Sequence, residues 1–395
     1  MNKKSKRICM VVQDYYPQDV RVRKEVSALC SEGYGVDVLC LKKNDQRRKE
    51  TIDGVKVFRL SLQKKRGNKF RYIFEYFYFF ILATLKLSIL NFRRKYDLIE
   101  VHTLPDLLIF STIIPKLFGS KVLLDLHEIM PEFFMSKFKA NEKSVVINIL
   151  MYLEKISVRY ADKAITVNDR ISKIIGERSN INYDIPVVMN SVDEDLFKKR
   201  KHIQTENYIL SYHGTLTELY GVEKGIKAVS LLKEKIPEIK FNIFGNGSSF
   251  EELKNLSNDL DLNDQVRFFG SIPFEEMSSE LAKVDLGILP LKVDPLTDNC
   301  CSTKLNEYIF LGIPVIMTRL RATLDYFDDK SIGYIEGNDA ETLADKIYEL
   351  YQNKTLASKL AANAHKSYKK IDWGIMRDRY LSVISDLLND NHMNR

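Results

Sequence analysis

The sequence predicts an α/β protein with two domains, each built on a doubly wound parallel sheet. Three observations lead to this fold class. The chain has 395 residues, 45% of them hydrophobic, which is enough for two full cores. Short apolar runs alternate with amphipathic helical stretches along both halves, and a charged segment at 193–206 separates the two series. We expect domains over 1–200 and 201–370, followed by a C-terminal helix within 371–395 that crosses back to the first domain.

Runs of three to six mostly apolar residues in the first half are predicted to be buried strands: 8–12, 36–41, 98–101, 121–125, 164–167 and 187–189. The first strand leads into a loop over 13–19 and then a helix with apolar residues at Val22, Val26, Leu29 and Cys30. A nicotinamide-binding domain needs Gly-x-Gly-x-x-Gly in that loop, which contains no glycine. This absence disfavours a dehydrogenase.

The most aromatic stretch, residues 72–85, is predicted to be a helix with basic residues on both sides: Lys64, Lys65, Arg66, Lys69 and Arg71 before it, and Arg93, Arg94 and Lys95 after it. Two interpretations stay open. We favour burial between the sheet and its neighbours for most of the helix surface. The aromatic rings and basic flanks are also typical of a membrane interface. We expect no segment to reach the ~20 apolar residues of a membrane span.

Charge is distributed unevenly along the chain, although the net value is only +7. Residues 1–200 carry 37 Lys and Arg against 24 Asp and Glu, whereas the remainder carries 23 against 29. A basic first half predicts an anionic surface or substrate for the first domain. We expect no nucleic-acid partner, because no binding module accompanies the basic residues. The five cysteines are odd in number and lack metal-ligand spacing, which favours a reducing cytoplasm.

The second half repeats the alternation, with strands predicted at 208–212, 241–244, 266–269, 286–289 and 315–317, and a helix from residue 338. Each of the first four strands ends in a small or polar turn: Gly214-Thr215, Gly245-Asn246-Gly247, Gly270-Ser271 and Pro290. Ligands of open α/β sheets bind outside the carboxyl ends of the strands. These turns are therefore the predicted edge of a binding site.

Residues 301–317 are predicted to form a phosphate-binding loop, a two-turn helix and a buried strand. Ser302 and Thr303 suit a helix N-cap, Gly312 suits the helix end, and Lys304 adds a cation beside free amides that bind phosphate oxygens. Glu307 lies about one turn into the helix. An ordinary αβ unit with a polar cap stays an equal alternative on these residues alone.

Several motifs, in their joint order and spacing, resemble one large family. They are Pro17-Gln18-Asp19-Val20-Arg21, Asp125-Leu126-His127-Glu128, Asn190-Ser191-Val192-Asp193, His213-Gly214-Thr215-Leu216, Lys224-Gly225, Phe244-Gly245-Asn246-Gly247, Val266-Arg267-Phe268-Phe269-Gly270, Leu289-Pro290, Lys304-Leu305-Asn306-Glu307-Tyr308 and Gly312-Ile313-Pro314-Val315-Ile316. The chain resembles a retaining glycosyltransferase of the GT-B type, group 1 or family 4-like. The resemblance implies two Rossmann-like domains facing a central cleft, the first binding the acceptor and the second the nucleotide-sugar.

The resemblance also implies roles for individual residues. Donor binding is implied for Gly214, Thr215, Lys224, Gly245, Asn246, Gly247, Gly270, Ser302, Thr303, Lys304 and Glu307. The acid matching Glu307 binds the ribose hydroxyls, and the histidine matching His127 faces the donor sugar. His127, Glu307 and Lys224 are the implied catalytic residues, while Asp19, Arg21 and Glu128 are candidates for contact with the acceptor.

Two positions depart from the family pattern. The acid expected eight residues before Glu307 is Asn299, and the basic residue expected after the glycine of the first loop is Thr215. Since the missing acid contacts hydroxyls of the donor sugar in the family, the identity of the sugar is left open. We interpret Asn299 as a variant of the motif.

The predicted function is transfer of a hexosyl or N-acetylhexosaminyl group from a nucleotide-diphosphate sugar, UDP favoured over GDP, with retention of configuration. We expect no metal or other cofactor, because the two Asp-x-Asp strings at Asp193 and Asp259 lie in the linker and a polar loop. The acceptor is predicted to be a saccharide or a polyprenyl-diphosphate-linked saccharide of cell-surface polysaccharide assembly, capsule or lipopolysaccharide included. A cytoplasmic location, peripheral at the inner face of an anionic membrane, follows from the basic first domain.

Two alternatives stay open. A nucleotide-sugar epimerase of the same fold would not need the aromatic, basic surface of the first domain. A catalytically silent, membrane-associated scaffold is the other, motivated by Asn299 and Thr215.

Overall fold

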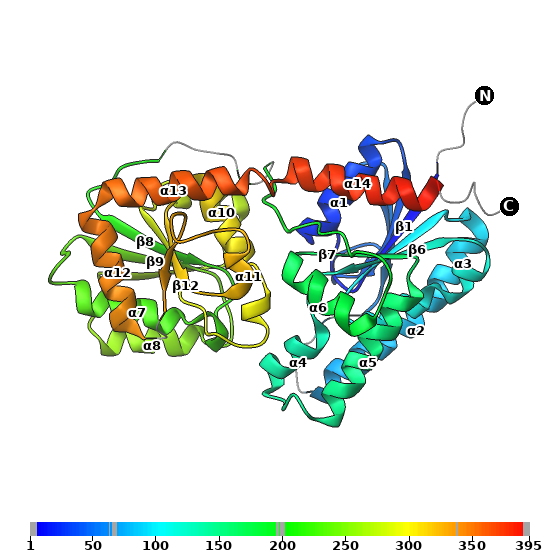
Figure 1. Cartoon of the computed structure of the whole chain (residues 1–395), viewed down its shortest axis with the longest axis horizontal. Coiled ribbons are helices and arrows are strands. Elements are labelled where there is room, and N and C mark those ends of the chain that lie inside the picture. The colour runs from blue at the N-terminus through cyan, green and yellow to red at the C-terminus, as the bar shows by residue number, and fades with distance from the viewer. Residues whose placement is uncertain are drawn as a thin grey trace. The chain divides into compact units, whose positions relative to one another are not determined.

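A computed structural model describes residues 6–62, 64, 69–194, 197, 202–336 and 339–389 (Figure 1). The chain divides into two compact units: unit 1 is Met1–Asn190 with Gly374–Arg395, and unit 2 is Ser191–Trp373. Lys65 and Arg66 of the basic flank lie outside the described residues, as do Asp195 and residues 198–201 of the charged segment.

The sheet of unit 1 has seven strands among the described residues, in the order β3-β4-β2-β1-β5-β6-β7. All neighbouring strands are parallel except β3 and β4. The expected strand at 187–189 forms only an isolated bridge between Thr166 and Val187. The strands are β1 (Arg7–Val12), β2 (Gly35–Leu41), β3 (Lys49–Ile52), β4 (Val55–Leu60), β5 (Leu98–His102), β6 (Lys121–Leu126) and β7 (Lys163–Thr166).

The β3-β4 hairpin is the part of this sheet that we did not predict. Asp53 and Gly54 connect the two strands, with φ angles of 49° and 83°. Two successive positive φ angles match the tight turn whose twist suits a hairpin, and Asp-Gly is a favoured pair for it. The hairpin adds an antiparallel edge to an otherwise parallel sheet.

The helices of unit 1 are α1 (Val20–Ser31), α2 (Lys69–Arg94), the 3-10 helix η1 (Asp106–Thr112), α3 (Ile113–Leu117), α4 (Met130–Phe138), α5 (Val145–Tyr160) and α6 (Asp169–Ser179). The C-terminal helix α14 (Trp373–Asn389) packs on the same unit from Gly374 onward (Figure 1). Tyr380 of α14 donates a hydrogen bond to Glu100 of β5 at 2.5 Å. The backbone N–H of Met189 lies 3.2 Å from the sulfur of Met376 in α14.

Helix α2 differs from what the sequence led us to expect. Among the described residues it is the one helix long and apolar enough to cross a membrane, over Arg71–Arg94, which corrects our expectation that no segment qualifies. Only 28% of its apolar window is buried, so the favoured interpretation of a mostly buried helix is also wrong. Phe79, Ala83 and Leu87 face the core, whereas Phe74 and Leu85 are 64% and 60% exposed.

The sheet of unit 2 has six strands among the described residues, in the order β10-β9-β8-β11-β12-β13, and all are parallel. They are β8 (Tyr208–His213), β9 (Ile239–Phe244), β10 (Val266–Gly270), β11 (Leu286–Leu289), β12 (Val315–Thr318) and β13 (Gly333–Ile335). The strand order reverses between β8 and β11. In such sheets this switch point is where ligands bind, outside the carboxyl ends of the strands.

Figure 1 shows α7, α8 and α12 along one side of this sheet and α10 and α13 along the other. The helices are η2 (Glu218–Tyr220), α7 (Val222–Leu232), α8 (Phe250–Asp259), α9 (Phe274–Leu281), η3 (Thr297–Asn299), α10 (Thr303–Leu311), α11 (Arg321–Leu324), α12 (Ala340–Gln352) and α13 (Lys354–Tyr368). Asp339 caps α12 by accepting the N–H of Thr342 at 2.7 Å, while residue 338, the expected start, lies outside the described residues. The charged segment belongs to unit 2, and the side chain of Phe197 within it is buried.

Candidate active site

Three loops of unit 2 meet where β8, β9 and β10 end. The backbone N–H of Gly214 donates to the carbonyl of Phe244 at 2.8 Å, and that of Gly245 donates to the carbonyl of Gly270 at 2.7 Å. These bonds extend the pairing of the parallel strands past their last residues. The structure therefore brings together the three glycine-containing turns that the sequence analysis selected.

Two of these glycines allow an approach that no other residue permits. A Cβ added at Gly245 would lie 1.8 Å from the carbonyl oxygen of Gly214, and the φ of Gly245 is +135°. A Cβ at Gly214 would lie 1.8 Å from Cε of Lys304. A side chain at either position would separate the loops or displace Lys304 from the sheet edge.

The other predicted loop residues hold the conformation of the turns. Oδ1 of Asn246 accepts the N–H of Gly247 at 2.7 Å, and the carbonyl of Asn246 accepts the N–H of Leu216 at 3.0 Å. The carbonyl of Thr215 accepts the hydroxyl of Tyr212 at 2.8 Å. Thr215, which stands where the family carries a basic residue, thus contributes a backbone carbonyl within the loop.

Lys224 links the two loops on either side of the switch point. It lies in the first turn of α7, is 6% exposed, and donates from Nζ to the carbonyl of Pro290 at 3.1 Å. Pro290 follows β11, whereas α7 follows β8. Burial lowers the pKa of Lys224. An ammonium removed from water attracts a phosphate oxygen more strongly than one that is fully hydrated.

Helix α10 begins and ends as the sequence predicts. Ser302 occupies the N-cap and Gly312 closes the helix with a φ of +78°. The side chain of Ser302 makes no capping hydrogen bond. The N–H of Leu305 donates to the carbonyl of Ser302 at 3.1 Å. The N–H groups before it, those of Thr303 and Lys304, are first-turn amides that point toward an anion placed at the helix start.

Lys304 points from this helix start across the neighbouring loop. Its Nζ lies 4.4 Å from the centre of the Tyr220 ring, a cation–π arrangement. Burial lowers the pKa of Lys304, and attraction to Glu307 opposes that shift. Lys304 therefore supplies a second amine at the same edge of the sheet as Lys224.

Glu307 is paired with a residue that the sequence analysis did not assign to the site. Nε2 of His213 lies 2.5 Å from Oε2 of Glu307. His213 is the last residue of β8, is 5% exposed, and packs edge-on against Tyr308 with the ring centres 4.6 Å apart. His213 could have been assigned to the site from the sequence, because it directly precedes Gly214, a predicted donor-binding residue. The Glu307 side chain stays 19% exposed, which leaves room for a ligand hydroxyl.

Asn299, the departure from the family pattern, lies in the short helix η3. Its Nδ2 donates to the carbonyl of Pro295 at 2.8 Å. The adjacent acid, Asp298, accepts the backbone N–H of Arg321 at 2.8 Å and also the Nε of that arginine at 2.5 Å. The two carboxylates that this loop contains are thus both engaged: Asp298 fixes α11, and Oδ1 of Asp294 accepts the N–H groups of Leu296 and Thr297.

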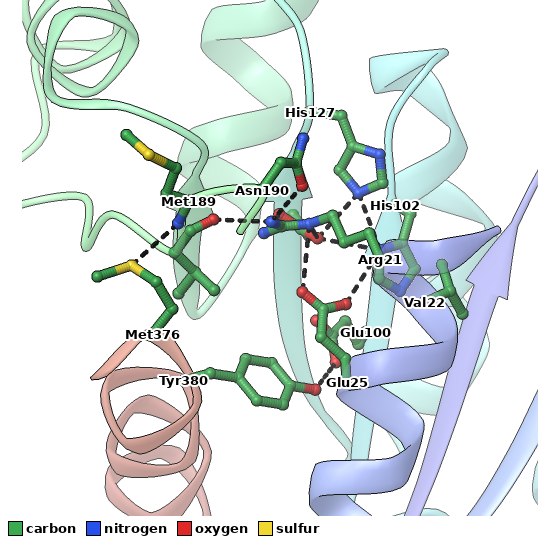
Figure 2. Close-up of polar contacts among 12 residues, drawn as sticks. Arg21, Val22, Glu25, Glu100, His102, His127, Met189, Asn190, Met376 and Tyr380 are labelled. Atoms are coloured by element: carbon green, nitrogen blue, oxygen red, sulfur yellow. Dashed lines mark hydrogen bonds and ion pairs between the residues drawn. The ribbon is translucent and has the colours of Figure 1, made fainter. Parts of the chain in front are cut away.

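Unit 1 contains a second polar cluster, at the carboxyl ends of β5 and β6 (Figure 2). Nε2 of His127 lies 2.9 Å from Oδ2 of Asp125, and Nδ1 of His102 lies 3.0 Å from the same oxygen. His102 is fully buried, and the side chain of His127 is 19% exposed. Burial lowers the pKa of His102. Burial opposes ionisation of Asp125, yet Arg21 and His127 hold its pKa well below the ordinary value.

Arg21 lies inside this cluster. Its Nε and Nη2 each donate to one oxygen of Asp125 at 2.7 Å, and Nη1 donates to the carbonyl of Val188 at 2.7 Å and to Oδ1 of Asn190 at 3.0 Å. The Arg21 side chain is 8% exposed and also pairs with Glu25 at 3.2 Å. We expected Arg21 to contact the acceptor. In the structure its guanidinium is engaged in hydrogen bonds within unit 1, and contact with the acceptor stays a prediction.

Asp19 and Glu128 are the other two residues predicted to contact the acceptor. Asp19 is the N-cap of α1 and accepts the N–H of Val22 at 3.2 Å, so its side chain stabilises that helix. Burial raises the pKa of Glu128, and His127 and Lys137 oppose that shift. Glu128 follows His127 directly and remains a candidate for contact with the acceptor.

Two groups of described side chains have the ligand types of a metal site: His102, Asp125 and His127, and Glu25, Glu100, His102 and Asp125. Both include Asp125, whose two oxygens already accept the guanidinium of Arg21. A fixed cation on that carboxylate disfavours a divalent ion beside it. Of the two Asp-x-Asp strings, the first has Asp195 outside the described residues and the second begins at the last residue of α8.

Comparison with known proteins gives a family match over most of unit 2. Residues 193–367 match the family described as glycosyl transferases group 1. The putative glycosyltransferase EpsD of Bacillus subtilis is 24% identical over 237 residues, which are 56% of this chain and 60% of that protein. The sulfoquinovosyl transferase SQD2 of Arabidopsis thaliana is 21% identical over 293 residues, 71% of this chain and 55% of that protein. The matches thus span little more than half the length of these relatives.

Solved structures match almost the whole chain. Sucrose-phosphate synthase from Thermosynechococcus elongatus superposes with a TM-score of 0.78 at 16% identity, covering 98% of this chain and 100% of that one. Anabaena HepE in complex with UDP-glucose superposes with a TM-score of 0.70 at 14% identity, covering 96% and 99%. At this identity the likeness establishes the fold, which is the two-domain GT-B architecture that the sequence predicted.

Proposed function

We propose that this protein is a glycosyltransferase that uses a nucleotide-diphosphate sugar, because residues 193–367 match the family described as glycosyl transferases group 1. One observation carries the proposal. Lys224, Lys304 and the start of α10 gather around the switch point of the unit 2 sheet, together with the Glu307–His213 pair. Two amines, free amides and one carboxylate suit a ligand with an anionic part and a hydroxyl-bearing part.

The donor would be held by two kinds of contact. The diphosphate is assigned to Lys224, Lys304 and the first N–H groups of α10, with the Ser302 and Thr303 side chains beside them. The ribose hydroxyls are assigned to Glu307, whose carboxylate accepts two hydroxyl protons at once. His213 would orient that carboxylate. We favour UDP as the nucleotide, supported by the complex of Anabaena HepE with UDP-glucose, and leave the sugar open because of Asn299.

The chemistry needs stabilisation of the leaving group. The bond between the anomeric carbon and the phosphate oxygen breaks, and its electron pair goes to the nucleoside diphosphate. The acceptor oxygen forms the new bond on the same face, and its proton passes to the departing phosphate oxygen. Lys224 and Lys304 would stabilise the developing charge, so no metal ion is required. Attack on the same face gives retention of configuration.

His127 is the proposed contact of unit 1 with the donor sugar. Its support is the Asp125-Leu126-His127-Glu128 motif together with the local hydrogen bonds. Asp125 is ionised and accepts from Nε2 of His127, so that Nδ1 is the ring nitrogen left for a ligand. Part of the imidazole is exposed, as contact with a ligand requires.

The acceptor is proposed to be a saccharide, or a saccharide linked to a polyprenyl diphosphate, in cell-surface polysaccharide assembly. Relatives include proteins described as an amylovoran biosynthesis and a teichuronic acid biosynthesis glycosyltransferase. The protein would act from the cytoplasm, peripherally at the inner membrane face, where a lipid-linked acceptor is reached. The basic first half of the chain supports an anionic membrane as partner.

The test is to incubate the purified protein with UDP-, GDP- and dTDP-sugars, with and without EDTA, while following free nucleotide and thermal unfolding. We expect release of one nucleotide, UDP, at a rate that EDTA leaves unchanged. Loss of turnover in EDTA would contradict the metal-free mechanism alone. Nucleotide binding without turnover favours the scaffold, and an isomerised sugar that stays on the nucleotide favours the epimerase. Absence of both turnover and a thermal shift overturns the proposal.

A further inference from the structure

Exposed apolar side chains of the described residues concentrate on one part of unit 1. Fifteen of the twenty large hydrophobic residues that are exposed lie on α2, on α3 with the residue after it, and on α5. We name this set the three-helix face: Ile73, Phe74, Phe77, Tyr78, Ile81, Leu85, Ile89, Phe92, Ile113, Leu117, Phe118, Val145, Val146, Ile149 and Tyr152. An apolar concentration of this size marks an interaction surface.

The helices that carry the three-helix face are neighbours in the structure. The rings of Phe92 and Phe118 meet edge-on with centres 5.0 Å apart, which joins the end of α2 to α3. Nζ of Lys116 in α3 lies 4.6 Å from the ring centre of Tyr160, the last residue of α5. Helix η1 packs against α2, α3 and α5 together. The three helices are therefore neighbours on one part of the domain.

Side-chain charge on these helices has a single sign at the surface. Helix α2 contains five Lys or Arg and one acid, α3 one Lys and no acid, and α5 two Lys or Arg and one acid. Both acids, Glu75 and Glu154, are buried. Exposed cations lie at the ends of α2: Arg93, and Arg71, which is half exposed and pairs with Glu75 at 3.0 Å. Lys137 stands over the ring of Tyr72 at 4.2 Å.

Helix α2 is fixed to unit 1 on its inner side. Phe79, Ala83 and Leu87 are fully buried there. Oδ1 of Asn91 accepts the backbone N–H of Tyr96 at 3.0 Å, and Nε2 of Gln13 donates to the carbonyl of Glu75 at 3.4 Å. Pulling α2 out to cross a membrane would expose this inner surface. A helix held in this way lies parallel to a membrane surface rather than through it.

We infer that the three-helix face docks unit 1 onto an anionic phospholipid bilayer, with the apolar side chains entering the interface and the cations contacting headgroups. Aromatic rings and cationic side chains without surface acids are the composition that this environment favours. The inference deepens the proposed function, on which it rests for the membrane-borne acceptor, by naming the surface that reaches it. The three-helix face includes α3 and α5 as well as the aromatic helix α2, and these helices come from separate parts of the sequence.

The experiment uses the full chain in flotation with vesicles of phosphatidylcholine and 30% phosphatidylglycerol, and with phosphatidylcholine alone. The test variant carries Phe74→Ser, Leu85→Ser and Phe92→Ser, three outward positions of α2. The matched control carries Leu231→Ser and Ile375→Ser, exposed apolar residues outside the three-helix face. We expect the test variant to lose at least about tenfold in bound fraction on anionic vesicles and the control to bind as the unchanged protein does.

Three results would overturn the inference. The first is binding by the test variant equal to that of the unchanged protein. The second is vesicle binding that survives alkaline carbonate extraction, as binding through a spanning helix does. The third is that the unchanged protein does not bind vesicles but forms a dimer, which the test variant does not form. Thermal unfolding midpoints show whether the variants fold. Release of nucleotide from a soluble donor distinguishes this inference from the proposed function. If the test variant releases nucleotide normally but does not float with the vesicles, the result supports docking through the three-helix face. If the unchanged protein and both variants release no nucleotide while vesicle binding by the unchanged protein is intact, the result contradicts only the proposed function.

Discussion

Asp125 and His127, two residues apart on the same strand end, are joined by a hydrogen bond of 2.9 Å from Nε2 of the imidazole to Oδ2 of the carboxylate. Because an ionised carboxylate only accepts hydrogen bonds, the proton of this bond belongs to Nε2, and Nδ1 is the ring nitrogen left for a ligand. Arg21 holds the carboxylate from the other side through two bonds of 2.7 Å. The orientation proposed for His127 therefore depends on Asp125 and, through Asp125, on Arg21.

The first prediction concerns this dependence. Asp125→Asn should lower turnover at least about tenfold, because an amide no longer selects the Nε2–H form of His127. In a His127→Ala background the same change should have little further effect. The measurement is a double-mutant cycle on kcat, with the tautomer of His127 followed by nitrogen NMR. Additive effects of the two substitutions would show that Asp125 does not act through His127.

A second prediction concerns pH and the buried acid Glu100. Burial, with Asp125 nearby, raises the pKa of Glu100 from its ordinary 4.5 to about 8. The folded state therefore holds a proton that the unfolded chain loses, so this contribution to stability is present below pH 4.5 and is lost as the pH rises toward 8. Glu100→Gln cannot ionise and still accepts the hydroxyl of Tyr380. It should reduce the fall in unfolding free energy between pH 4.5 and 8 by more than about 1 kcal/mol.

Urea unfolding at several pH values measures this slope. Burial also raises the pKa of Glu25, which remains in the variant, so the slope should shrink without vanishing. A slope unchanged by Glu100→Gln would mean that Glu100 is ionised in the folded protein.

Parallel strands, turns and the α10 element were predictable because each leaves a local pattern of apolar runs, glycines and caps. The β3-β4 hairpin left a local pattern too, Asp53-Gly54, which we did not use. The outward face of α2 was not predictable, since its inner and outer sides are both apolar and periodicity cannot tell them apart. The Glu307–His213 and Arg21–Asp125 pairs join residues about a hundred positions apart, and no local rule records such contacts.

A third prediction separates Lys224 from a neighbour on the same helix. Lys224→Ala should lower kcat by about a hundredfold, because the substitution removes a buried ammonium that we assign to stabilising the leaving group. Lys227→Ala, one turn further and exposed, is the matched control and should leave kcat unchanged. Steady-state kinetics with the preferred donor checks both. Equal effects of the two substitutions would remove Lys224 from the leaving-group site.

A fourth prediction tests the close approach of the two glycine loops. Gly245→Ala should destabilise unit 2 by at least about 2 kcal/mol and weaken nucleotide binding, since the new Cβ overlaps the carbonyl of Gly214. Gly176→Ala is the control, because Gly176 lies within α6 and, apart from the helix's own nearby backbone, nothing lies within 4 Å of the added Cβ. It should stabilise unit 1 by about 0.5–1 kcal/mol. Unchanged stability and binding in Gly245→Ala would contradict the loop geometry.

The central claim is that the edge of the unit 2 sheet binds a nucleoside diphosphate through Lys224, the start of α10 and Glu307. Calorimetric titration of UDP into the protein and into Glu307→Ala tests it most directly, with Glu341→Ala on α12 as a control away from the edge. We predict saturable binding by the unchanged protein and the control, and at least about tenfold weaker binding by Glu307→Ala. Equal affinity in all three proteins, or no binding by any, would contradict the claim.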